Sequence, residues 1–369
     1  MQTPDTNLMH QTFSEPPFPP ELPPLEQHEV KSWKKIHSFY FHGNASEYFG
    51  IWIVNILLTI ITLGLYAPWA KVRRLRYFYG NTEFFQRRFD FTGIPRKILI
   101  GRLIALALYI GFSVISNYSV KVSLIGLAII YFVVPWLIRA TLRFKARNSK
   151  FGNSRFYFSG TNKEIYWVFF KSILLTIFTG GLFYPVTIWL FKRYTLDHLY
   201  VGQLKFKLRA EWSAFMRAFY YPVLAFIALI GVYGIVLWFF AGSLANLGAE
   251  EMSVIFGVMY LIGLLLIWPL ISARIFIVTW NNITLSRSEF NTNCNQWHYV
   301  WIIVSNWFLK IITIGFMSPW AAIRLYKYQV ESLSLNLKND PDSMLNRVQE
   351  DHSAIAEEIS DVFDFDISL

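Results

Sequence analysis

Polar side chains recur at helical spacing along a stretch of the chain that is otherwise apolar. Steps of three and four residues join Asn55, Thr59, Thr62, Tyr66, Trp69, Arg73 and Arg76. In a helix these steps place all seven side chains on one stripe, which runs from an apolar segment into a basic loop. Amide, hydroxyl and guanidinium groups in this order are suited to bind a small polar or anionic solute.

Two later segments carry related stripes. The second segment contributes Thr176, Thr179 and Arg193, and the third contributes Asn306, Lys310, Thr313 and Arg324. A plainer interpretation is helix packing, because Thr and Asn in apolar helices often bond to their own backbone or to a neighbouring helix. Both interpretations stay open on the sequence alone.

Lys310 is the most informative residue of the third stripe. An ammonium group within an apolar segment is costly and therefore suggests a function. The equivalent positions in the other two segments hold Thr59 and Thr176. We therefore expect the third segment to hold the activity, with Glu47 and Glu164 as counter-charges, unless those two carboxylates only cap helices.

The composition predicts a membrane protein. Hydrophobic residues make up 54% of the 369 residues and charged residues only 16%, whereas soluble domains are about 25% charged. Four apolar stretches are long enough to cross a bilayer, which needs roughly 20 residues. They are residues 98–116, 122–138, 219–241 and 252–271.

The sequence also repeats itself. Shifts of 117 and 251 residues superpose Thr62 and Gly64 on Thr179 and Gly181, and then on Thr313 and Gly315. These offsets predict three repeats separated by two transmembrane helical hairpins. The expected organisation is an acidic Pro-rich tail (1–30), repeat 1 (31–97), hairpin 1 (98–138), repeat 2 (139–218), hairpin 2 (219–272), repeat 3 (273–337) and an acidic amphipathic tail (338–369).

The first repeat carries the pattern FxFxGNxxEYFxIWxxNxxLTxxTLGxYxPWAxxRxxRY, followed by FDFTG. This pattern resembles the YjgN-like family of bacterial inner-membrane proteins over residues 39 to about 337. The resemblance implies a multi-pass inner-membrane protein with a domain of unknown function, and it implies no reaction or substrate. Ser172 stands where the pattern has Asn, and Lys310 where it has Thr.

Loop charges predict the topology. The net charge is +10, and the basic residues gather beside the apolar segments. By the positive-inside rule, both termini and all basic loops are expected to be cytoplasmic and to contact anionic phospholipid. This arrangement favours repeat segments that enter the bilayer and return, although a kinked full span is the rival. Short alternating stretches at 39–41, 88–91, 155–158 and 205–208 predict a small cytoplasmic β-layer on an all-α polytopic fold.

Several classes of function are not expected. Cys294 is the single cysteine and the seven histidines lack ligand spacing, so we expect no metal and no cofactor. No catalytic motif occurs in a supporting context, so we expect no enzyme, and the basic loops suit lipid better than nucleic acid. Two functions remain: transport or permeation of a small polar or anionic solute, and a membrane scaffold that binds partners through its strands and tails. The sequence does not predict an oligomeric state.

Overall fold

The computed structural model describes residues 36–116, 120–239 and 249–338. Short strands alternate with pairs of helices along the whole of this range. The predicted tails at 1–30 and 338–369 lie outside the described residues, apart from Lys338.

The strands are two to five residues long. They are β1 (Ile36–Ser38), β2 (Tyr40–Phe41), β3 (Thr82–Phe84), β4 (Arg87–Phe91), β5 (Ser149–Phe151), β6 (Ser154–Phe158), β7 (Leu199–Val201), β8 (Leu204–Leu208), β9 (Ile283–Leu285), β10 (Ser288–Thr292) and β11 (Leu333–Asn336).

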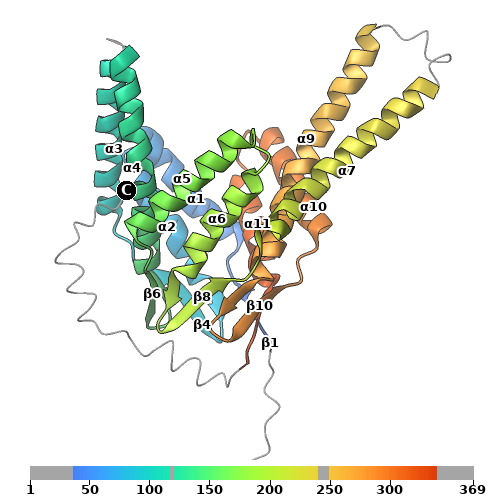
Figure 1. Ribbon diagram of the computed structural model, residues 1–369. Coiled ribbons are helices and arrows are strands. Elements are labelled where there is room, and N and C mark those ends of the chain that lie inside the picture. The colour runs from blue at the N-terminus through green and yellow to red at the C-terminus, as the bar shows by residue number, and fades with distance from the viewer. Residues whose placement is uncertain (1–35, 117–119, 240–248, 339–369) are drawn as a thin grey trace, which may run out of the picture. The chain divides into compact units, whose positions relative to one another are not determined.

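The described helices form five consecutive pairs. They are α1 (Ala45–Ile61) with α2 (Ala67–Gly80), α3 (Pro95–Ser116) with α4 (Val120–Arg147), α5 (Asn162–Phe178) with α6 (Tyr184–Asp197), α7 (Trp212–Phe239) with α9 (Ala249–Trp280), and α10 (Gln296–Ile312) with α11 (Ser318–Glu331). They lie at one end of the sheet, opposite its hairpin turns (Figure 1).

All the strands belong to one antiparallel sheet that closes on itself. Its order is β1-β11-β10-β9-β8-β7-β6-β5-β4-β3-β2. The two end strands, β1 and β2, are separated only by Phe39, whose backbone N–H donates to the carbonyl of Leu333 at 3.2 Å. The first and last described segments of the chain therefore complete a ring, which leaves no long unpaired strand edge.

Fixed spacings divide the chain into five equivalent units. In each unit a buried proline on the second helix lies 14 residues before the next strand begins. These prolines are Pro68, Pro135, Pro185, Pro269 and Pro319. A phenylalanine lies six residues before the first residue of each pair's first helix, and these are Phe39, Phe89, Phe156, Phe206 and Phe290. The helix pairs differ in length between units.

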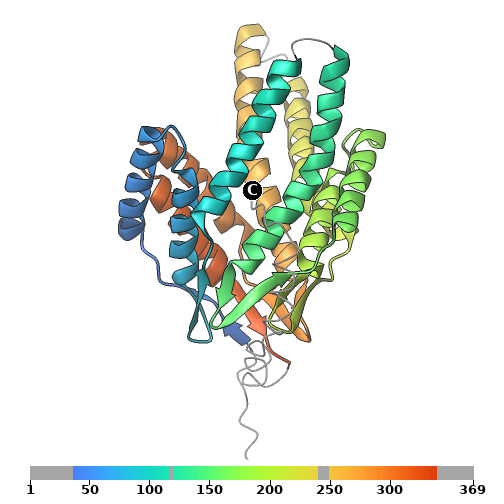
Figure 2. The same cartoon turned by 90° about the vertical axis from the view of Figure 1, so that its left-hand side faces the viewer.

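The helices also form a closed ring. Each packs chiefly against the helix before it and the helix after it, and α1 packs against α11. Figure 2 shows the α3–α4 pair in front, the α7–α9 pair behind and the shorter pairs on either side. A ring of helices therefore stands on a ring of strands, and both follow the order of the five units.

The chain reverses direction within each of the three short helix pairs. The two helices of each pair are 17 and 14 residues long, and they are joined by a tight turn. Gly64, Gly181 and Gly315 occupy this turn with φ near +90°. A positive φ of this kind is open to glycine and strained for other residues, so the repeated glycine fixes the turn.

The predicted fold class, an all-α polytopic protein with a small β-layer, is wrong. The short strands that the sequence predicted are present, but they belong to a closed 11-stranded sheet. The two predicted transmembrane hairpins, α3–α4 and α7–α9, are longer versions of the same unit as the three predicted repeats. Within the described residues, only 212–235 form a helix long and apolar enough to cross a membrane, judged by length and composition.

Candidate functional site

The predicted threonines bond to their own helices. Thr62 donates to the carbonyl of Leu58 at 2.7 Å and accepts the N–H of Tyr66 at 3.0 Å. Thr179 and Thr313 make the same two bonds in their own pairs. Thr59 and Thr176 each donate to the carbonyl four residues earlier. These hydroxyls tie the turn to the preceding helix, as the packing interpretation expects.

The asparagine position of the three stripes is different. Asn55, Ser172 and Asn306 are buried at the same place in α1, α5 and α10. The amide N–H of Asn306 donates to the carbonyl of Ala321 at 3.0 Å. Within the described part of the chain, Oδ1 of Asn55, Oδ1 of Asn306 and Oγ of Ser172 have no hydrogen-bond partner. Buried polar atoms are seldom left without a partner, so these three atoms stand out among the polar groups of the helices.

The predicted arginines are largely engaged within the protein. Nε of Arg76 donates to the carbonyl of Phe91 at 3.1 Å, and Arg193 pairs with Asp197 at 3.3 Å. Arg324 donates to Oγ of Ser305 at 2.7 Å and lies over the Trp320 ring.

Two of the predicted cations are placed differently. Arg73 is exposed on α2. Lys310 lies in the last turn of α10, close to the turn of its pair, and its side chain is partly buried.

The two predicted counter-charges lie at helix starts. Glu47 accepts a hydrogen bond from the Tyr77 hydroxyl at 3.0 Å, and Glu164 forms a capping box with Thr161. Burial alone would raise the pKa of Glu164. The Thr161 N–H and hydroxyl, together with His198 at 3.3 Å, outweigh that effect and hold the pKa below its usual value. Glu164 therefore caps its own helix and Glu47 binds Tyr77, and both lie in first helical turns, whereas Lys310 lies in the last turn of α10.

The structure does not gather the three stripes into one cluster. The helices of the first and third stripes, α1 and α10, flank α11, whereas α5 packs chiefly against α4 and α6. Among the described residues, no three His, Cys, Asp or Glu side chains lie close enough together to hold a metal ion.

A ring of aromatic side chains, which was not predicted from the sequence, lies inside the sheet; we call it the phenylalanine ring. Its members are Phe39, Phe89, Phe156, Phe206 and Phe290. Successive centroids around the ring lie 6.5, 6.4, 6.3, 6.1 and 6.2 Å apart, and the planes of neighbours differ by 21° to 27°. The strands that carry neighbouring members are roughly 9.5 Å apart, at two strand spacings, so the side chains converge toward the middle of the closed sheet.

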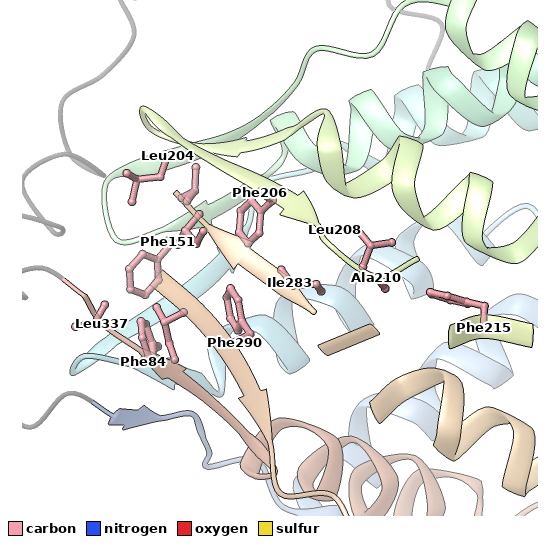
Figure 3. Packing of buried hydrophobic residues seen from close by; sticks show 13 residues of the cluster. Phe84, Phe151, Leu204, Phe206, Leu208, Ala210, Phe215, Ile283, Phe290 and Leu337 are labelled. Atoms are coloured by element: carbon pink, nitrogen blue, oxygen red, sulfur yellow. The ribbon is translucent and has the colours of Figure 1, made fainter. Parts of the chain in front are cut away.

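A second apolar layer lies against the phenylalanine ring. It consists of Phe84, Phe151, Val201, Leu285 and Leu335, which are all buried and occupy equivalent positions in the remaining strands. Phe84 stacks on Phe39 at 4.2 Å. Figure 3 shows Phe84, Phe151, Phe206 and Phe290 gathered between the strands that carry them. The signal for both layers is a five-fold recurrence, which a search for three repeats does not find.

Comparison with known proteins places the chain in a family. Residues 36–362 match the model of DUF898, described as a bacterial protein of unknown function. The chain belongs to the DUF898 family. No solved structure matches it.

Relatives of this DUF898 chain include the inner membrane protein YjgN of Escherichia coli O157:H7 and of strain K12. Each is 36% identical over 155 residues, which cover 41% of this chain and 38% of the relative. YjgN of Salmonella typhimurium is 27% identical over 166 residues, which cover 41% and 42%. The predicted family resemblance is thereby confirmed, and the names of these relatives support the predicted bacterial inner-membrane location.

The turns of the three short helix pairs present large apolar side chains on the surface. Leu63 is 95% exposed, Phe178 82% and Ile314 90%. Their neighbours Ile61, Ile177, Ile311 and Ile312 are also exposed. An apolar surface of this kind is rare on a protein surrounded by water and marks a site of contact with lipid or protein.

Proposed function

We propose that this DUF898 chain forms a path by which a small polar or anionic solute crosses the bacterial inner membrane. The observation that carries the proposal is the closure of both layers, the helix ring and the strand ring, in the same order of five units. Two stacked rings share one axis, and that axis passes through the molecule from the helix turns to the sheet.

The charge on the helices suits an anion. Between its buried proline and the sheet, each second helix carries basic residues, and the five together hold 13 Lys or Arg against two acids, Asp197 and Glu331. A surplus of cations raises the local concentration of anions and lowers the cost of removing their water. The same residues would bind anionic phospholipid where they face the bilayer.

The helix ring is set in lipid, with the sheet and both termini on the cytoplasmic side. The exposed apolar turns of the short pairs support this orientation, because they need a partner that is not water. The basic ends of the second helices lie next to the sheet, which suits a cytoplasmic position by the positive-inside rule.

The second candidate function is a membrane scaffold. One observation favours it: apolar side chains fill the interior of the sheet. A scaffold needs no path along the axis, and partners would bind the charged outer faces of strands such as β4 and β8.

A flux assay separates the two functions. The full chain is reconstituted into liposomes loaded with chloride, phosphate or glutamate, and release is compared with that from empty liposomes. Transport predicts faster release of at least one anion, and Lys310→Thr, which restores the residue found at Thr59 and Thr176, lowers that rate. Release equal to that of empty liposomes for every solute would favour the scaffold.

A further inference from the structure

We propose that the phenylalanine ring is a hydrophobic gate, which closes the path along the axis to water and ions. This inference rests on the proposed function and names the element that regulates it. The five members come from five different units, and each holds the same place in its unit.

The geometry of the ring leaves little room at its centre. All five centroid distances fall between 6.1 and 6.5 Å, so the centroids form a nearly regular pentagon. Small angles between neighbouring planes show that the rings lie close to a common plane, with their edges directed inward. Once the width of the aromatic rings is taken off, the opening is little wider than a single water molecule and too narrow for an ion with its hydration shell.

The side chains around this opening carry no polar group that could replace the hydration shell of an ion. The second layer, Phe84, Phe151, Val201, Leu285 and Leu335, continues the apolar surface along the axis. A narrow apolar constriction excludes water by dewetting, and an ion cannot pass without its water. The two layers together therefore form a closed apolar segment between the helix ring and the turns of the sheet.

Part of the ring is still accessible. Phe39, Phe89 and Phe156 are only partly buried, whereas Phe206 and Phe290 are 9% and 5% exposed. Three of the five members therefore keep some surface that protein atoms do not cover, as a gate at the end of a wet path requires.

The alternative is that the phenylalanines only fill the core. The test changes the three accessible members together, Phe39, Phe89 and Phe156, either to Leu or to Ser. The Leu variant keeps the constriction apolar, and the Ser variant makes it wettable. In the liposome assay we expect the Ser variant to raise anion leak by about tenfold or more while the Leu variant stays close to the natural protein.

Phe144→Ser is the matched control. Phe144 lies on α4 and is buried against Phe91, in a cluster that contains no member of the phenylalanine ring. It should lower the thermal stability without a leak. A leak in Phe144→Ser as large as in the triple Ser variant would show that loosened packing, and not wetting of the ring, opens the path, and it would overturn the proposal.

A chemical variant covers the case in which the triple Ser protein does not fold. Phe156→Cys, made with Cys294→Ser, is folded first and then treated with a charged methanethiosulfonate reagent. Attachment of the charge should open the path and raise the leak, whereas a neutral reagent of the same size should not. No leak after complete labelling, confirmed by mass, would overturn the gate.

Failure of the gate and failure of the proposed function give different results. If the gate is wrong but transport is right, the natural protein passes solute and the Ser and labelled variants pass it no faster. If transport is wrong, neither the natural protein nor any ring variant releases more than empty liposomes. Equal leak from the Leu and Ser variants would show that volume, not apolar character, closes the path, and would overturn the dewetting gate.

Discussion

A glycine follows three members of the phenylalanine ring by four residues, and a neighbouring side chain explains it. A Cβ built on Gly93 would lie 2.4 Å from the Phe91 ring, and one on Gly43 would lie 2.5 Å from the Phe41 ring. In the fourth unit Leu208 replaces the aromatic residue, and Ala210 replaces the glycine. A phenylalanine at this position therefore requires a glycine two residues later, because a Cβ there would collide with the aromatic ring.

This pairing predicts the effect of a single methyl group. Gly93→Ala should destabilise the protein by about 1–3 kcal/mol, because the added Cβ overpacks the Phe91 ring. Adding Phe91→Leu, which copies the fourth unit, should recover part of the loss. The measurement is thermal unfolding in detergent, with Gly50→Ala as control, since a Cβ on Gly50 meets nothing within 4 Å. No recovery in the double variant would contradict the explanation.

The turn threonines give a second prediction at this scale. Thr313→Val removes the bond donated to Leu309 and the bond accepted from Met317. Stability should fall by about 1–2 kcal/mol through these lost hydrogen bonds. Thr176→Val removes one hydrogen bond at an exposed site and should lower the stability by a smaller amount. Loss of solute flux by Thr313→Val at unchanged thermal stability would instead favour a binding role for the stripe.

Among the elements, the helix turns could be predicted from the sequence and the five units could not. Three units have 23 residues between the start of the first helix and the buried proline, so a fixed offset superposes them. The other two have 40 and 57, and their extra apolar residues resemble independent transmembrane hairpins. Strands of three to five residues carry too little pattern to show that they pair across the whole chain.

The candidate site, too, could be predicted from the sequence only in part. The polar stripes were visible as helical spacings, but spacing alone did not show that the threonine hydroxyls bond to the backbone. The phenylalanine ring depends on strands that are 50 or more residues apart in sequence and meet only when the sheet closes. In the sequence, its members cannot be distinguished from other phenylalanines in short strands.

The end of the last strand is held by a small charge network that gives a pH prediction. Glu289 on β10 pairs with Lys338 at 2.7 Å and Arg209 at 3.2 Å. The hydrogen bond from Lys338 and its charge hold the pKa of Glu289 below its ordinary value of 4.5. A lowered pKa means that the contribution to stability is present above the unfolded-state pKa and is lost as the pH falls through the folded-state value.

The natural protein should therefore lose more thermal stability than Glu289→Gln when the pH is lowered from 6 to below 4.5. The effect is small because the group is exposed to solvent and screened by salt. Thermal unfolding midpoints at several pH values make the measurement. Parallel pH profiles for the two proteins would show that this network does not contribute.

For the molecule as a whole, the account requires that the helix turns meet lipid and the sheet meets water. A nitroxide attached at Phe178→Cys should be accessible to oxygen and shielded from a polar nickel reagent, because apolar turns lie in the hydrocarbon. A label at Gln203→Cys, in the exposed turn between β7 and β8, should behave in the opposite way. Equal access of the nickel reagent to both labels would contradict the proposed orientation.

The five units, the shared axis and the gate all depend on closure of the strand ring. A disulfide between Ser38→Cys on β1 and Ser334→Cys on β11, which are register partners, tests this closure in a Cys294→Ser background. Oxidation should link the two cysteines within one chain, so that a protease cut in a sheet turn leaves both fragments joined. Fragments that separate after full oxidation, or links that form only between chains, would show that the first and last strands do not meet.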